Sequence, residues 1–324
     1  MRKLLFFVSA GGAVLASGSL ARRYRHDLDL DRARLALVGR AVIPTSFGAV
    51  EYAERGTGEP LLAIHGIFGG CDSGLVSVDG LFPDRRVIAP SRFGYLGSDR
   101  PADATPADQA DAFAALLDGL GIERTDVIGF SAGATSALQF GLRHPDRIKH
   151  LVVLSGNLPG SPTAAIQPQA NRLLVRSEFP MWAVRTFAGP AFARMVGTPR
   201  GLPLTAADER MIADVVGACF PVLPRAEGVL FDFFVSNPDV NNYDLVTLMV
   251  PTLIVHAKDD PLASYEAARR AAGRIPGARL VSVDRGGHLM LGQQEVVAAE
   301  LAGFLEGTEA ARVATAPGSG AGGA

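Results

Sequence analysis

The stretch of sequence that decides the fold runs Asp126-Val127-Ile128-Gly129-Phe130-Ser131-Ala132-Gly133. Its first half is a short apolar run, which is typical of a strand buried on both faces of a sheet. A segment with apolar residues at helical spacing, 132–143, follows directly. A serine at such a strand-to-helix turn is held in a strained conformation that exposes its hydroxyl. This position, more than the common Gly-x-Ser-x-Gly pattern, indicates that Ser131 is a nucleophile. The alternative is a glycine-rich turn with a capping serine.

The same kind of apolar run recurs along the chain and predicts further buried strands. They are expected at 61–64, 86–89, 151–154, 252–255 and 279–283, after two strand-like stretches at 40–43 and 49–54. Segments with helical spacing separate several of them, at 107–120, 132–143 and 264–274. Alternating buried strands and helices predict an α/β fold, in which a mostly parallel twisted sheet carries helices on both faces.

The alternation is interrupted between residues 158 and 246. This stretch is rich in aromatic residues and has helical spacing in parts, with no clear strand pattern. We therefore expect an inserted helical cap at 158–246, between the two parts of one core, 41–157 and 247–306. Most of the aromatic residues would then form the cap's own interior. The glycine- and alanine-rich tail, 307–324, cannot bury apolar surface and is predicted to be disordered.

The first 26 residues differ from the rest of the chain. Met1-Arg2-Lys3 precedes an apolar run, Leu4–Ala21, and arginines follow at 22, 23 and 25. Such a run is typical of a membrane anchor with a transmembrane helix or of a cleaved signal segment, and both predict a protein of the cell envelope. The flanking positive charges nearly balance, so the side of the membrane stays open. A buried helix of the fold is a further alternative. Residues 27–40 are expected to be a charged spacer.

Composition narrows the function classes. The 324 residues suggest one large domain, or one domain with an insertion. Hydrophobic residues make up 48% and charged residues 20%, which suits a globular protein with a sizeable core. The net charge is −2 and no Lys/Arg cluster stands out in the globular part, so nothing points to nucleic acid. Cys71 and Cys219 lie far apart and show neither a metal-ligand spacing nor a disulfide framework.

A general base is the first partner that a nucleophilic serine needs. A serine hydroxyl is a weak nucleophile at neutral pH unless an imidazole takes its proton and a carboxylate orients that imidazole. Two of the six histidines, His256 and His288, follow the expected cap. His256 ends a predicted strand and is interpreted as a packed structural residue. His288 lies in a glycine-rich loop just beyond the strand at 279–283, where an exposed imidazole is expected. His288 is therefore the predicted base.

The carboxylate is expected after the strand at 252–256, where the chain reads Lys258-Asp259-Asp260-Pro261. Asp259 and Asp260 are both candidates. Pro261 helps to fix the loop, because a proline pushes the residue before it towards an extended conformation. The residues alone leave the choice between the two aspartates open.

Together these motifs resemble the α/β-hydrolase superfamily, in the branch of serine-nucleophile bacterial hydrolases with a helical cap. The resemblance covers about residues 41–306. It is carried by His65-Gly66, Gly129–Gly133, Pro251–His256 and Gly287-His288, and by Arg143–Ile148 before a strand. The segment 90–101 departs from the family, whose members often carry an Asp and an Arg near the positions of Ser91 and Phe93. A serine nucleophile is unlike the epoxide-hydrolase and haloalkane-dehalogenase branches, which attack through a carboxylate.

The resemblance implies a role for each site residue. Its register selects Asp260 as the acid, beside Ser131 as nucleophile and His288 as base. The loop 65–70 would supply one oxyanion donor, the backbone N–H of Ile67, and the second would be that of Ala132. His65 is expected to hold this loop rather than to act as a base. The residues expected to contact substrate are Phe68, Phe130, Trp182 and Leu289.

The predicted activity is hydrolysis of an ester or related acyl bond in a small to medium apolar molecule, with no metal and no organic cofactor. The same three residues also serve carbon–carbon bond hydrolysis, acyl transfer and perhydrolysis, and spacing does not separate these reactions. A ligand-binding protein that keeps the fold without catalysis is the remaining alternative. The predicted partners are a small-molecule acyl substrate and, through the N-terminal segment, a membrane.

Overall fold

A computed structural model of the chain describes residues 2–165 and 168–307. It contains an eight-stranded sheet with the strand order β1-β2-β4-β3-β5-β6-β7-β8. The strands are β1 (Arg40–Thr45), β2 (Gly48–Arg55), β3 (Glu59–Ile64), β4 (Arg85–Pro90), β5 (Thr125–Phe130), β6 (Ile148–Leu154), β7 (Thr252–Ala257) and β8 (Arg279–Val283). β2 pairs antiparallel with β1 and β4, and the other pairings are parallel. The predicted α/β fold, with its mostly parallel sheet, is confirmed.

Helices cover both faces of the sheet. They are α2 (Cys71–Ser77), α3 (Pro106–Gly119), α4 (Gly133–Arg143), α10 (Tyr265–Arg274) and α11 (Gln294–Leu305). Successive side chains of a strand point to opposite faces, and β5 shows the result. Val127 packs in one apolar cluster with side chains of α3, α4 and α10. Ile128 packs in another with Val297 and Leu301 of α11. The strands therefore read as continuous apolar runs because both of their faces are buried.

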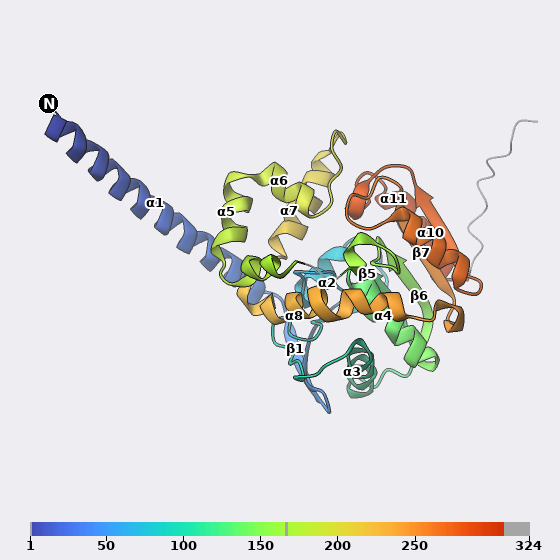
Figure 1. The fold of residues 1–324 in the computed structure, drawn as a ribbon. Helices are drawn as coiled ribbons and strands as arrows, with labels where there is room; N and C mark the ends of the chain where they lie inside the picture. Colours follow the sequence, from blue (N-terminus) through green and yellow to red (C-terminus); the bar gives the residue numbers. More distant parts are fainter. Residues whose placement is uncertain (1, 166–167, 308–324) are drawn as a thin grey trace, which may run out of the picture.

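The segment predicted to be a cap is helical, and no strand occurs in its described residues. Its helices are α5 (Phe179–Phe187), α6 (Gly189–Met195), α7 (Ala206–Gly217), α8 (Ala226–Phe231) and α9 (Asn237–Asp239). A π-helical turn, Asp232–Ser236, joins α8 to α9. α5, α6 and α7 lie together at one end of the molecule, beside α1 (Arg2–Ala36) (Figure 1). Trp182, Phe192 and Phe220 form their buried interior, as aromatic residues of such a segment are expected to do.

Two buried ion pairs join the helical segment to the core. Arg92, which follows β4, contacts both carboxylate oxygens of Asp232 at 2.6 Å, and both side chains are at most 1% exposed. Arg225 contacts Asp72 of α2 at 2.9 and 3.1 Å and is equally buried. Tyr95 also donates its hydroxyl to Asp232 at 2.5 Å. A charge buried without its partner is costly, so these pairs hold the two parts of the chain together.

The second half of α1 contacts the helical segment. The sequence predicts a spacer at these residues of α1. Asp27 accepts a hydrogen bond from the indole N–H of Trp182 at 2.9 Å. One turn later, Asp31 forms a bidentate ion pair with Arg185. Each carboxylate oxygen lies 2.8 Å from a guanidinium nitrogen. Residues four apart share one face of a helix, so these acidic side chains reach α5 together. Residues 27–36 are thus a docked helix end, and this corrects the predicted spacer.

The run predicted to be a membrane anchor or signal segment, Leu4–Ala21, lies within α1. Among the residues that the structure describes, no helix is long and apolar enough to cross a membrane. α1 extends away from the rest of the molecule beyond its contacts with α5 (Figure 1). The tail predicted to be disordered lies outside the described residues, apart from Gly307.

We expect Asp232→Ala to lower the free energy of unfolding by about 3–5 kcal/mol, because it leaves the Arg92 guanidinium buried without its counter-charge. Chemical denaturation followed by circular dichroism measures this change. Asp118→Ala is the matched control: it removes an ion pair with Arg147 whose aspartate is 69% exposed, so about 1 kcal/mol or less is expected. Equal effects of the two substitutions would contradict a special role for the buried pair.

Candidate active site

Ser131 lies in a tight turn between β5 and α4. Its φ is 53°, in the left-handed region that a non-glycine residue adopts only under constraint. The neighbouring glycines make the turn possible. A Cβ on Gly129 would lie 2.6 Å from the Cβ of Ala137, and one on Gly133 would lie 2.3 Å from the carbonyl oxygen of Ile64. Strand, turn and helix therefore pack too closely for any side chain at either glycine, and this packing presents Ser131.

His288 lies next to the Ser131 hydroxyl. It sits in a short 3-10 turn after β8, Gly287–Leu289. Its Nε2 is 2.8 Å from the Oγ of Ser131, and its Nδ1 is 2.8 Å from Oδ2 of Asp260. A carboxylate only accepts, so Nδ1 carries the proton, and Nε2 is free to accept from the serine. The imidazole is therefore in the tautomer that a general base requires.

The two neighbouring aspartates have different contacts. Asp260 is inaccessible to solvent and contacts His288, while its Oδ1 accepts backbone hydrogen bonds from Leu262 and Ala263 at 2.8 and 3.0 Å. Burial alone would raise the pKa of Asp260, but His288 and these hydrogen bonds hold it below its ordinary value. Asp259 accepts from the backbone N–H of Gly287 at 2.8 Å. Asp260 thus orients the imidazole, and Asp259 holds the loop that carries it.

His256, the other histidine after the helical segment, is fully buried. Its Nε2 lies 3.2 Å from the carbonyl oxygen of Ala263 and 3.5 Å from Oδ2 of Asp260. Burial lowers its pKa, against the opposing influence of Asp260. It packs beneath the acid and has no hydrogen bond to Ser131, in keeping with its interpretation as a structural residue.

The loop after β3 lies against Ser131, since a Cβ on Gly66 would be 3.0 Å from that of the serine. The Gly66 carbonyl accepts from Nδ1 of His65 at 2.7 Å and from Nη2 of Arg92 at 3.2 Å. This carbonyl belongs to the same planar peptide as the N–H of Ile67. Fixing the carbonyl therefore fixes the direction of the Ile67 N–H, and hydrogen bonds to the oxygen also polarise that donor.

His65 is part of this arrangement and is not placed as a base. Its Nε2 accepts from the backbone N–H of Arg92 at 3.0 Å, which leaves the proton on Nδ1 for the Gly66 carbonyl. Burial, followed by the charge of Arg92, lowers the pKa of His65 well below its ordinary value. The ring is therefore neutral, as both hydrogen bonds require.

Arg92 and Asp232 are the site residues that sequence reasoning missed. Arg92 lies in the segment 90–101. This segment departs from the family pattern, in which an Asp and an Arg are common near the positions of Ser91 and Phe93. The buried arginine at this place pairs instead with an aspartate 140 residues further along the chain. No spacing rule links residues so far apart. The one available signal was a charged residue two positions after the end of the buried strand β4.

A cavity of about 120 Å³ opens beside Ser131 and His288. Among the predicted contact residues, Phe68, Phe130 and Leu289 line it, and so does Ile67. Ala132 directly follows the serine as the residue that begins α4.

Trp182 does not line this cavity, and its predicted contact with substrate is corrected. Its side chain is 0% exposed and lies 4.9 Å from the ring of Tyr24. The tertiary contact with α1, which its sequence surroundings do not indicate, removes it from the site.

A cysteine also lies beside Ser131. Cys219 lines the cavity, but burial raises the pKa of its thiol to about 11, so it is protonated at neutral pH and a poor nucleophile. In the described part of the chain, no group of three His, Cys, Asp or Glu side chains is placed to hold a metal ion. The arrangement that remains is a serine, a histidine and an aspartate in hydrogen-bonded series beside a small apolar cavity.

Comparison with known proteins identifies the family. A family model described as the alpha/beta hydrolase fold matches residues 59–294. The chain belongs to this family of enzymes. A 2-hydroxymuconate semialdehyde hydrolase from Pseudomonas putida is 28% identical over 272 residues, which cover 78% of this chain and 88% of that protein.

Solved structures show the same relationship. An alpha/beta hydrolase fold protein from Nakamurella multipartita is 25% identical, with a TM-score of 0.68 over 82% of this chain and 99% of that chain. A thermophilic esterase from Thermogutta terrifontis is also 25% identical, with a TM-score of 0.62 over 83% of this chain and 98% of that chain.

Proposed function

We propose that the protein hydrolyses an ester or a related acyl bond of a small to medium apolar substrate. One observation carries the proposal. Asp260, His288 and Ser131 form an unbroken hydrogen-bonded series, with 2.8 Å at each step. That series converts a weak hydroxyl nucleophile into a strong one, and it is the arrangement that acyl transfer requires.

In the proposed reaction, the Ser131 hydroxyl oxygen attacks the substrate carbonyl carbon while Nε2 of His288 takes its proton. The backbone N–H groups of Ile67 and Ala132 stabilise the resulting oxyanion. Collapse expels the alcohol, which receives the proton from His288 and leaves the acyl group on the serine. A water molecule then gives a proton to His288 and attacks the acyl carbon. The acid is released as the proton returns to Ser131.

Carbon–carbon bond hydrolysis is a second candidate. It is favoured by the similarity to a semialdehyde hydrolase along most of the chain, whereas the similarity to a thermophilic esterase favours the ester reaction. Both reactions would use Ser131 and His288. A panel of acyl esters assayed beside vinylogous diketones separates them, and we expect turnover of the esters.

We expect a fluorophosphonate probe to label the native protein covalently, because the activated Ser131 attacks phosphorus as it attacks a carbonyl. Labelling followed by mass spectrometry of the peptide identifies the residue. The Ser131→Ala variant, checked for folding by circular dichroism, should take up no label. Equal labelling of this variant, or an unlabelled native protein, would overturn the proposed function.

The two neighbouring aspartates give a matched test of the acid. We expect Asp260→Asn to lower kcat by about 10⁴-fold, because an amide no longer stabilises the correct tautomer and the charged imidazole. Asp259→Asn keeps an oxygen that can accept from the Gly287 N–H, so it should lose less than about tenfold. Steady-state kinetics with one ester substrate compares them. The reverse order would assign the acid to Asp259.

We also propose that the N-terminal segment takes the protein to the cell envelope. The support is the sequence alone, a basic start followed by the apolar run Leu4–Ala21 and further arginines. Cell fractionation with N-terminal sequencing of the mature chain tests this. We expect the protein in the envelope or exported fraction, and an uncleaved chain found in the cytosolic fraction would contradict it.

A further inference from the structure

A second and larger cavity, of about 490 Å³, adjoins the one at Ser131. The two cavities share four lining residues, Ser77, Phe130, Val215 and Leu289. Phe130 and Leu289 are the immediate neighbours of Ser131 and His288 in the sequence. The larger cavity therefore adjoins the reactive groups, and these shared side chains border both cavities.

The size of the cavity at Ser131 makes the second one relevant. A volume of about 120 Å³ is somewhat smaller than that of an engineered cavity of about 150 Å³ that binds benzene. It accommodates the reacting carbonyl and a small group beside it. The neighbouring 490 Å³ lies in the range of sites that accept small-molecule ligands. Any sizeable group attached to the carbonyl has to extend beyond the first cavity.

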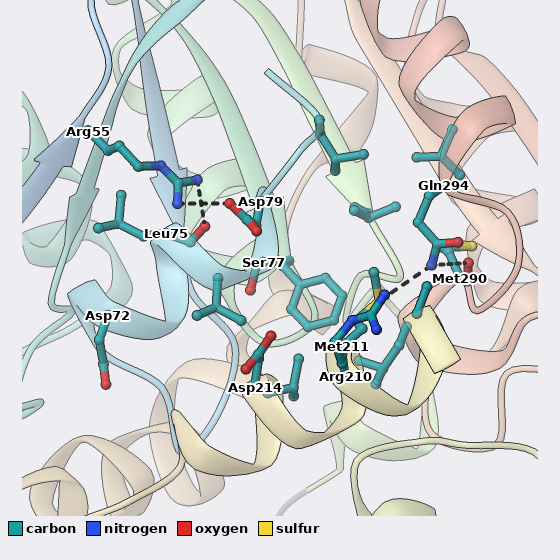
Figure 2. Close-up of a pocket in the computed structure, with 18 of the residues that line it drawn as sticks. Arg55, Asp72, Leu75, Ser77, Asp79, Arg210, Met211, Asp214, Met290 and Gln294 are labelled. Carbon is teal, nitrogen blue, oxygen red and sulfur yellow. Dashed lines mark hydrogen bonds and ion pairs between the residues drawn. The ribbon is translucent and has the colours of Figure 1, made fainter. Parts of the chain in front are cut away.

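The chemical character of the second cavity changes from its floor to its rim. Its floor is apolar and is built from Phe130, Leu154, Met290 and Val297. The short helix α2 borders it on one side and α7 on the other, so that Met211 reaches towards Met290 and Gln294 (Figure 2). Such walls favour a flexible apolar group over a polar one.

The rim carries charges of both signs, and one further charged residue, Asp72, is buried in the wall of the cavity. Three arginines and three aspartates line the cavity, namely Arg34, Arg55, Arg210, Asp72, Asp79 and Asp214. Arg34 pairs with Asp72 and Arg55 with Asp79, as Figure 2 shows for the second pair. Opposite charges in equal number leave no net attraction for an anionic or a cationic group. The ligand that fits these walls and this rim is therefore uncharged along its length.

We propose that this second cavity binds an unbranched, uncharged aliphatic chain of the substrate while its carbonyl lies at Ser131. The inference rests on the proposed ester hydrolysis and adds a substrate class, esters with a long apolar chain. Burial of each methylene is expected to raise kcat/KM about fourfold at most, as long as the cavity has room for it.

Two ester series test the proposal. They also show whether the second cavity binds the acyl chain or the alcohol chain of the ester. p-Nitrophenyl acyl esters vary the acyl chain from acetate to decanoate, and n-alkyl acetates vary the alcohol chain over the same lengths. We expect kcat/KM to rise by at least tenfold with length in one of the series. A chain that ends in a carboxylate should lose this gain, because the three arginines and three aspartates that line the cavity give no net attraction for a negative charge.

Substitutions that fill the second cavity test whether the preference for long chains arises there. Met211→Trp and the more exposed Ala207→Trp both put an indole into it, and we expect each to reduce the long-to-short ratio of kcat/KM by at least tenfold. Ala213→Trp is the matched control, because residue 213 is exposed on the same helix and does not line the cavity. Its ratio should equal that of the native protein. Circular dichroism verifies that the variants are folded.

The outcomes separate the two proposals. If the native protein hydrolyses no ester and takes up no fluorophosphonate, the proposed function fails. If the native protein hydrolyses esters but its kcat/KM does not rise with chain length in either series, the second cavity is not the chain-binding site. The same conclusion follows if both cavity-filling variants keep the native preference for long chains. A preference for chains that end in a carboxylate would overturn the assignment of an uncharged ligand.

Discussion

The active site depends on the absence of space for a side chain at Gly129 and Gly133. Backbone and small side chains of β3, β5 and α4 come so near one another that a Cβ at either glycine would overlap them. The left-handed conformation of Ser131 follows from this packing. Strain of this kind persists only where the surroundings enforce it. The sheet and α4 thus hold the turn in this conformation. The serine hydroxyl is therefore positioned by the core of the fold.

The opposite side of the site is positioned by buried charge. Arg92 reaches the Gly66 carbonyl and the Asp232 carboxylate at the same time, so one guanidinium connects the loop beside Ser131 to the helical segment above it. Arg225, which itself belongs to the helical segment, contacts the Gly69 carbonyl of the same loop and the Asp72 carboxylate of α2. The geometry of the loop is therefore coupled to the position of α8, at whose two ends Arg225 and Asp232 lie. A shift of this helix would move the Ile67 peptide as well.

Local signals in the sequence were sufficient for the fold class and for the candidates at the site. Buried strands read as apolar runs, and the turn at Ser131 is defined by its immediate neighbours. The residues alone left Asp259 and Asp260 open, and the family resemblance selected Asp260. The loop geometry agrees, since the Asp260 carboxylate faces His288. Asp232 and Trp182 could not be placed, because their partners, Arg92 and Asp27, are 140 and 155 residues away. Pairings over such distances exist only once the chain has folded.

The docking of α1 has a practical consequence for anyone who shortens this chain. Removal of the first 36 residues would take away Asp27 and Asp31, and with them the acceptor for the Trp182 indole and the counter-charge of Arg185. It would also uncover the ring of Trp182, which Tyr24 contacts edge to face. A cut just before Tyr24 keeps all of these contacts. The N-terminal helix thus contains a natural truncation point, and it lies inside the helix, well before its end.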